Sequence, residues 1–398
     1  MAVRKTGISL FTGAGGLDLG FEAAGFDTKV AVEMDEDAVA TLNRNRSWNV
    51  IPKDIHSVTS SELLKVAGMK EGEPDILIGG PPCQPFSKSG FWANGDTKRL
   101  DDPRSGTLGA FLRVLRDTLP QSFLIENVPG LAFQGKDEGL DLIERSVEAI
   151  NRERKVSYDI RIAKLNAAHY GIPQLRERVF VIASRSGVPF VFPKETHGEG
   201  LKPFATAWDA IGDLVWNDDP ALRVRGKWAG LLSSIPEGQN YLWHTERGGG
   251  MALFGWRRRY WSFLLKLAKR LPSWTLQAQP GPAIGPFHWE SRRLSMRELC
   301  RLQTIPDRFV VLGDIATVQR QVGNAVPSAL AEVLGRAIRK QFFGDSVKLA
   351  PTLIPTPRLP VPPKTRTRKV PDEYLNLIGD HEPHPGTGKG HKASRRVV

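Results

Sequence analysis

Short apolar runs alternate with helical patterns through the first third of this 398-residue chain. The runs have the length and composition of buried strands. They lie at residues 7–11, 28–33, 74–79 and 121–126. Amphipathic patterns at 35–45 and 106–119 predict helices between them. This alternation predicts an α/β fold with a doubly wound parallel sheet, whose ligands bind beyond the carboxyl ends of the strands.

A glycine-rich turn, "FTGAGG", follows the first predicted strand and leads into a helix. Gly13, Gly15 and Gly16 let a cofactor approach the backbone closely, and Glu33 ends the next strand, where its carboxylate suits two ribose hydroxyls. Asp54, after a third strand, suits an adenine amino group. The turn lacks the dinucleotide pattern G-x-G-x-x-G, which favours a nucleoside with a side chain over a dinucleotide. A glycine turn followed by an acidic residue also arises by chance.

The stretch "GGPPCQPF" (79–86) contains Cys83, one of only two cysteines in the chain. Prolines on both sides forbid helix and remove amide donors, so an exposed, stiff loop is expected there. Taken alone, the stretch leaves two interpretations open. Cys83 is either a reactive thiol or a cysteine that happens to lie in a turn.

Glu126 and Asn127 end the next strand, "QSFLIEN", and should lie at the same sheet edge as Cys83. A thiol facing a carboxyl group suggests covalent attack on an electron-poor ring, with the acid assisting. Arg176 and Arg178 alternate on one face where a later strand begins. By themselves the glutamate and the arginines would be interpreted as solvated charges at strand ends.

Composition narrows the class of protein. Two cysteines cannot build a disulfide framework, and the chain opens with too short an apolar run for a signal peptide. No apolar stretch is long enough to span a bilayer, so we expect a cytoplasmic protein without a membrane partner. The net charge of +12 and the pI near 9.7 fit a polyanionic partner, although a basic pI alone is a weak argument.

Five motifs in order resemble those of the cytosine-5 DNA methyltransferases: "FTGAGG", "GGPPCQPFS", "ENV", "QLRER" and "VGNAVP". The resemblance covers roughly residues 4 to 343. It implies a Rossmann-like sheet dependent on S-adenosylmethionine, a smaller inserted target-recognition domain and a returning C-terminal helix. It also implies an enzyme of the prokaryotic restriction-modification type that acts on double-stranded DNA in the bacterial cytoplasm, in association with the nucleoid.

By this resemblance, the residues around S-adenosylmethionine come from the glycine turn, the ends of the next strands, the proline loop, the helix after it and the "VGNAVP" segment. Met34 stands where the family often has an aromatic or apolar residue against adenine. The set is Phe11, Gly13, Ala14, Gly15, Gly16, Glu33, Met34, Asp54, Ile55, Pro82, Leu108, Asn324, Ala325 and Val326. No metal site is predicted.

The resemblance also implies a role for each catalytic residue. The thiolate of Cys83 adds to carbon 6 of cytosine, which makes carbon 5 nucleophilic. Protonated Glu126 bonds ring nitrogen 3, Arg176 contacts the ring carbonyl oxygen, and Arg178 orients Glu126 and the cysteine loop. Because carbon 6 cannot be reached inside a duplex, the base must be flipped out, and the loop containing Ser87 is expected to close over DNA.

Four segments are expected: a catalytic domain (4–186), a target-recognition domain (187–292), a segment returning to the catalytic domain (293–343) and a disordered basic tail (344–398). The second contains eight of the ten tryptophans, most of them expected in its core, and arginines suited to DNA contact, namely Arg257, Arg258 and Arg259. From 348 to 398 the chain has ten Lys or Arg and four Asp or Glu, a net of +6. A solvated tail is favoured over a DNA-binding arm there.

Other functions remain open at this level. A cysteine hydrolase using Cys83 and His169 would leave the glycine turn and Asn324 unexplained. A noncatalytic DNA-binding protein would not need the four catalytic side chains, and a tRNA-methylating relative shares the Pro-Cys-Gln pattern. Cys300, at helical spacing beside leucines, is interpreted as packing. We expect a monomer, and any cognate restriction endonuclease would act independently.

Overall fold

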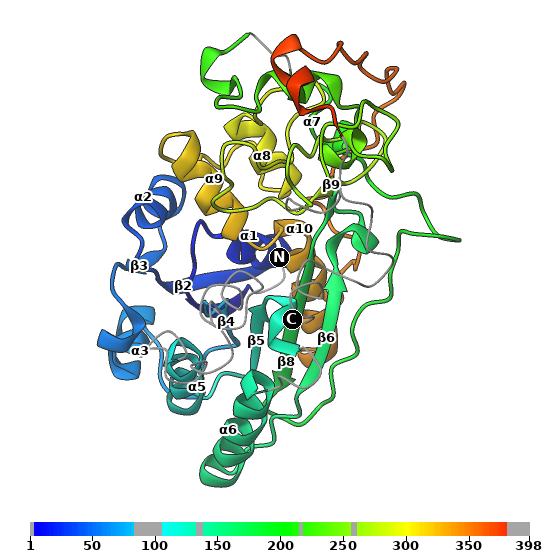
Figure 1. Cartoon of the computed structure of the whole chain (residues 1–398). Coiled ribbons are helices and arrows are strands. Elements are labelled where there is room, and N and C mark those ends of the chain that lie inside the picture. Colours follow the sequence, from blue (N-terminus) through cyan, green and yellow to red (C-terminus); the bar gives the residue numbers. More distant parts are fainter. Residues whose placement is uncertain (1–3, 83–105, 133–137, 215–217, 256–260, 380–398) are drawn as a thin grey trace, which may run out of the picture.

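The computed structural model describes residues 4–82, 106–132, 138–214, 218–255 and 261–379 (Figure 1). Its centre is a seven-stranded sheet of order β3-β2-β1-β4-β5-β8-β6. These strands are β1 (Lys5–Leu10), β2 (Phe26–Val32), β3 (Asn49–Ile51), β4 (Ile76–Gly79), β5 (Ser122–Asn127), β6 (Arg161–Asn166) and β8 (Glu177–Ser184). The helices of this part are α1 (Gly16–Ala24), α2 (Glu36–Asn45), α3 (Ser60–Ala67), α5 (Gly106–Thr118) and α6 (Glu138–Arg154).

The first five strands are parallel, while β8 runs antiparallel to both β5 and β6. The doubly wound fold predicted from the sequence is confirmed, and all four predicted strands and both predicted helices are present within three residues of their expected ends. The strand order reverses between β1 and β4. In open α/β sheets such a switch point is where ligands bind.

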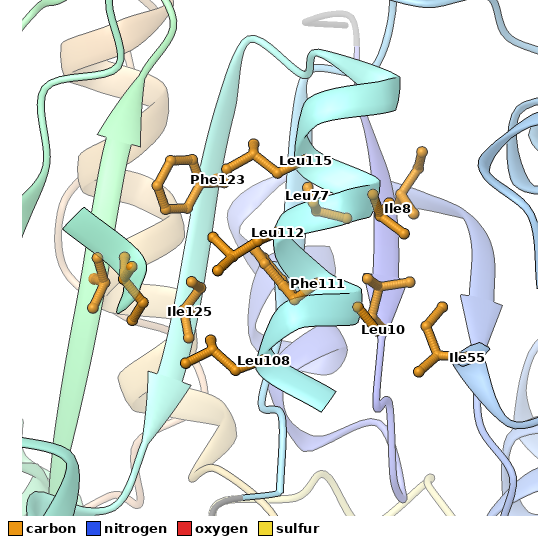
Figure 2. Close-up of a cluster of buried hydrophobic side chains, with 14 of the residues drawn as sticks. Ile8, Leu10, Ile55, Leu77, Leu108, Phe111, Leu112, Leu115, Phe123 and Ile125 are labelled. Carbon is orange, nitrogen blue, oxygen red and sulfur yellow. The ribbon is translucent and has the colours of Figure 1, made fainter. Parts of the chain in front are cut away.

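Apolar side chains cover both faces of the sheet, since successive residues of a strand point to opposite sides, and Figure 2 shows the cluster on one face. In β5, Phe123 and Ile125 face one side and Leu124 faces the other. Helices α3, α5 and α6 cover the first side, where α5 presents the i, i+3, i+4, i+7 series Leu108, Phe111, Leu112 and Leu115. Helices α1 and α10 (Ser328–Phe342) cover the second.

Helix α10 packs directly on α1, although the two are far apart in sequence. The contact requires a glycine, since a Cβ on Gly20 would lie 2.2 Å from the Ser328 carbonyl oxygen. Helix α10, the last long helix among the described residues, is therefore part of the sheet domain, and it carries the preceding "VGNAVP" segment back to the glycine turn.

Most of the other described residues form a second unit above the sheet in Figure 1. Its regular elements are short: α7 (Ala207–Ile211), α8 (Met296–Leu302), α9 (Ile315–Asn324) and a two-stranded sheet of β7 (Gln174–Leu175) with β9 (Ser273–Trp274). One apolar cluster joins α7, α8 and α9 and includes Trp289 and Cys300. A second cluster is built on Leu231, Tyr241 and Phe263. Long irregular segments therefore pack through side-chain burial rather than through backbone ladders.

The prediction that residues 344–398 are disordered is wrong for residues 344–379. This segment, which we call the strap, leaves α10 and crosses to the second unit (orange to red in Figure 1). Thr352 bonds the buried carboxylate of Glu332, and Tyr374 is 4% exposed within the second apolar cluster. Proline content indicated the absence of helix, but it did not preclude fixed extended packing. Residues 380–398 lie outside the described part.

Cys300 behaves as the sequence indicated. It is 4% exposed in the cluster of α8, and burial raises the pKa of its thiol to about 12, which keeps it protonated and unreactive. Of the tryptophans predicted to lie in a core, Trp289 is buried and Trp208 and Trp228 pack partly buried, whereas Trp261 is exposed. No helix among the described residues is long and apolar enough to cross a membrane.

Candidate active site

A cavity of about 920 Å³ opens at the carboxyl ends of β1, β4 and β5, at the switch point of the sheet. Its walls come from the glycine turn, the ends of β2 and β5, the start of the proline loop and the end of α9. It therefore brings most of the predicted cofactor residues and the predicted catalytic acid into one cavity.

The glycine turn is built as a cofactor cradle. Gly13 and Gly15 have φ of 54° and 78°, in the left-handed region that favours glycine. A Cβ on Gly13 would meet nothing within 4 Å, so its backbone is open to a ligand. The carboxylate of Glu33 accepts from the Gly13 amide at 2.6 Å and from the Asp35 amide at 2.8 Å. These bonds fix the carboxylate at the cavity wall and leave lone pairs for hydroxyl donors.

Most predicted cofactor residues line this cavity. They are Phe11, Gly13, Ala14, Gly16, Glu33, Met34, Asp54, Ile55, Pro82, Asn324, Ala325 and Val326. Met34 is 65% exposed, as an apolar platform for a flat ring requires. Asp54 accepts from the amide and ring of His56, and these hydrogen bonds lower the pKa of its carboxyl, which keeps it an acceptor.

Two predicted cofactor residues lie elsewhere. Leu108 is 5% exposed in the core beneath α5, because it belongs to the apolar face of that helix (Figure 2). Gly15 faces Leu42 and Phe309 rather than the cavity, and its left-handed backbone serves to begin α1. The prediction that these two contact the cofactor is therefore not supported by the structure.

Sequence reasoning missed Arg320, which lines the cavity from α9. Its guanidinium pairs with the carboxylate of Asp35 and, at 2.7 Å, with that of Asp37. This arginine ties the end of α9 to the turn after β2, beside Met34. The signal was available, since Arg320 precedes Asn324 by four residues and so lies on the same face of a helix.

The described start of the proline loop is anchored beside Glu126. The carbonyl of Pro81 accepts from the Asn127 side chain at 3.2 Å, and that of Pro82 accepts from the Thr107 hydroxyl at 3.2 Å. Because Gly79 pairs with Ile125 in the sheet, the next residues of the two strands also lie together. A Cβ on Gly80 would lie 2.9 Å from a Glu126 oxygen, so this position requires glycine or displacement of the acid.

Glu126 and Arg178 form a nearly buried ion pair, with Nε 2.8 Å from Oε1 and side chains 13% and 11% exposed for the arginine and the glutamate. Burial raises the pKa of the Glu126 carboxyl, while Arg178 and Arg176 oppose that shift. A carboxyl group with a raised pKa is suited to donate a proton or a hydrogen bond near neutral pH. The predicted contact of Arg178 with Glu126 is present.

Arg176 does not lie where the sequence placed it. Its side chain is 1% exposed and donates to the carbonyls of Leu276 at 3.2 Å and Gly323 at 2.7 Å. Among the described residues of the cavity wall, Arg178 is present and Arg176 is not. Arg176 and Arg178 alternate along the chain as predicted, but the segment around β9 packs over Arg176 and encloses it. The prediction that Arg176 contacts the ring is wrong in this arrangement.

Several predicted site residues lie outside the described part of the chain: Cys83, Ser87, Arg257, Arg258 and Arg259. Within the described ranges, no group of three or more His, Cys, Asp or Glu side chains is arranged to hold a metal ion.

The family model of the C-5 cytosine-specific DNA methylases matches residues 5–340 of the chain. The chain belongs to this family. Among curated relatives, the methylase is 41% identical to type II methyltransferase M.SacI of Streptomyces achromogenes, over 84% of this chain and 93% of that one. It is 32% identical to M.NgoFVII of Neisseria gonorrhoeae, over 86% and 88% of the two chains.

Solved structures of similar fold include an Escherichia coli protein described as a DNA modification methyltransferase encoded within a prophage. It is 26% identical to this methylase, with a TM-score of 0.60 over 85% of this chain and all of that chain. DNMT2 of Spodoptera frugiperda, 15% identical with a TM-score of 0.59 over 84% and 99% of the chains, shares the fold.

The family and fold imply S-adenosylmethionine as the methyl donor of this DNA cytosine methyltransferase. The chemical groups of the cavity wall fit S-adenosylmethionine. It offers an open glycine backbone, a fixed carboxylate for hydroxyls and an exposed apolar side chain for a ring. No feature of the described wall favours a pyrophosphate, since the turn carries no dinucleotide pattern.

Proposed function

We propose that this methylase transfers a methyl group to carbon 5 of a cytosine flipped out of a specific duplex DNA sequence, through a covalent bond between Cys83 and carbon 6. One observation carries the proposal. The cavity that holds the predicted cofactor residues also contains Glu126 paired with Arg178, next to the anchored backbone that leads into Cys83. A pocket built this way suits one flat base beside a methyl donor.

Cys83 supplies the electron pair that carbon 5 lacks. Its thiolate forms a bond to carbon 6, and the ring electrons move so that nitrogen 3 accepts a proton and carbon 5 becomes nucleophilic. S-adenosylmethionine supplies an electrophilic methyl group. Once carbon 5 carries that methyl group, loss of its proton breaks the bond from sulfur to carbon 6 and releases the thiolate.

Glu126 is the group that gives nitrogen 3 its proton and takes it back at the end. Its raised pKa keeps the carboxyl protonated to higher pH than an exposed glutamate. Arg178 holds the carboxyl in place, and we assign it the contact to the ring carbonyl oxygen, because it is the arginine at the cavity wall. Arg176 then has a positioning role, through its bonds to Leu276 and Gly323.

We assign sequence recognition to the second unit. We also propose that the methylase is a type II modification enzyme that acts in the bacterial cytoplasm. The support is the similarity to type II methyltransferases over most of the chain and the continuity of the second unit with the cavity through Leu276. We propose that the chain acts as a monomer and independently of any endonuclease.

Expression in a bacterial host that lacks cytosine methylation tests this function. We expect bisulfite sequencing to show protected cytosines in one sequence context, and mass spectrometry of nucleosides to identify them as 5-methylcytosine. Cells carrying Cys83→Ala are the control and should show none. Modified tRNA with unmodified DNA would indicate the RNA-methylating alternative, and N4-methylcytosine would overturn the assignment of the reacting atom.

Glu33→Ala should weaken binding of S-adenosylmethionine by roughly 10²- to 10⁴-fold in calorimetry, since two hydrogen bonds to a charged carboxylate contribute about 1.5–3 kcal/mol each. Glu36→Ala removes the same side chain from an exposed position in the first turn of α2 and should leave affinity unchanged. Equal affinity in the two variants, or tight binding of NAD, would contradict the assignment of the cavity.

A further inference from the structure

The strap is fixed to the second unit at several points. Thr365 donates its amide to Glu237 at 2.6 Å and accepts from the Lys269 ammonium at 2.9 Å. The amide of Arg368 donates to the Ser233 carbonyl at 2.9 Å. Tyr374 bonds the Lys227 carbonyl at 2.8 Å and stacks on Trp228. The segment from 365 to 371 is therefore held in one extended course without helix or strand, and Tyr374 lies in the 3-10 helix Asp372–Leu377 that follows.

Basic side chains project from this anchored segment. They are Lys364, Arg366, Arg368 and Lys369, and all four are exposed. Thr365 lies between the first two with its hydroxyl turned to Lys269. From residue 355 to 371 the sequence has no Asp or Glu. Within the described residues, none of the four forms an ion pair with a carboxylate.

We propose that these four side chains, the basic strap, form a surface that binds the phosphate backbone of duplex DNA outside the target cytosine site. This proposal depends on the proposed function in one respect only: that function identifies duplex DNA as the partner. Because the backbone that carries these four cations is already fixed, binding costs it little conformational freedom. Each phosphate contact also releases counterions from the DNA, which favours binding.

Two features distinguish the basic strap from an ordinary solvated face. It holds four cations within the six residues 364–369, and residues 355–371 contain no Asp or Glu. The strap also begins after residue 340, where the match to the family model ends, so this surface is an addition of this chain to the shared fold. Its contacts carry no base-reading geometry, which predicts affinity without sequence preference.

The test compares two variants of the full chain that each lose four positive charges. One replaces Lys364, Arg366, Arg368 and Lys369 by Gln. The control replaces Lys65, Lys70, Arg152 and Lys155, which are exposed and lie at the amino ends of the strands, away from the cavity. Affinity for a 30-base-pair duplex is measured over a series of salt concentrations without cofactor. Thermal unfolding checks that both variants fold, since the anchors Thr365 and Tyr374 are retained.

We expect the strap variant to lower the slope of log affinity against log salt by about two to four, because each phosphate contact contributes roughly 0.9. Its affinity at low salt should fall roughly 10- to 100-fold, equally for duplexes with and without the methylated sequence. The control should keep the wild-type slope. Equal slopes in the two variants would overturn the proposal, as would strap-dependent binding to phosphatidylserine vesicles with no change toward duplex. Failure of the wild-type chain to methylate DNA would count against the proposed function alone, because the slope is measured separately.

Discussion

Duplex DNA with 5-fluorocytosine at the target position should become covalently attached to the methylase at Cys83 once S-adenosylmethionine is added. The bond from sulfur to carbon 6 breaks only after carbon 5 loses its proton, and fluorine cannot leave in that way. Cys83→Ala should form no adduct and lose methylation by roughly 10⁴-fold or more, as removal of a catalytic nucleophile does. Denaturing electrophoresis and a peptide map of the complex measure the outcome.

Cys300→Ala is the matched control for this experiment. Cys300 is buried and its thiol pKa is about 12, so we expect its loss to cost about 1 kcal/mol of unfolding free energy and no chemistry. Cys83→Ala should keep duplex affinity within a few-fold, because that affinity comes mainly from phosphate contacts. An adduct mapped to Cys300, or an active Cys83→Ala enzyme, would refute the covalent mechanism.

Glu126→Gln should slow single-turnover methyl transfer by about 10²- to 10⁴-fold, the usual contribution of a positioned proton donor. Glutamine preserves the shape of the side chain and accepts from Arg178, but it cannot deliver a proton to nitrogen 3. In the wild type, the rate should fall as pH rises through the Glu126 pKa, because the protonated form is the active one and burial raises that pKa. This alkaline decline should disappear in the variant.

Glu177→Gln provides the comparison, since Glu177 neighbours Arg178 on the same strand but is exposed and pairs with Lys164. Its rate and pH profile should match the wild type. Arg178→Ala should lose activity and should raise the pKa of Glu126 further, because it removes the charge that opposes the effect of burial. If Glu126→Gln kept the wild-type rate and pH profile, the acid would have to be assigned to another residue.

Periodicity and strand-end logic predicted much of the fold and the site. Apolar runs revealed the strands, and the rule that ligands bind at the carboxyl ends of parallel strands brought Gly13, Glu33 and Glu126 to one cavity. Asn324 came from the resemblance rather than from any pattern, because a contact across some three hundred residues leaves no local signal. Its position in the wall agrees with that expectation.

Features set by packing between distant segments could not be predicted. The alternation of Arg176 and Arg178 indicated one shared face, yet only the second unit decides that Arg176 is enclosed by Leu276 and Gly323. The strap has the composition of a disordered tail, and its order comes from partners such as Glu332 and Trp228 that its own sequence does not reveal. Leu108 was expected at the cavity, but its helix turns that side chain into the core.

The pairing of Arg320 with Asp35 joins residues 285 positions apart, and it carries a consequence for synthesis in the cell. A ribosome adding about 5 to 20 residues per second takes roughly 15 to 60 s to travel that distance. Throughout that interval the glycine turn has already emerged, but the wall that α9 contributes does not yet exist. A chain that ends before α9 therefore lacks this wall of the cavity, and we expect it to bind S-adenosylmethionine poorly.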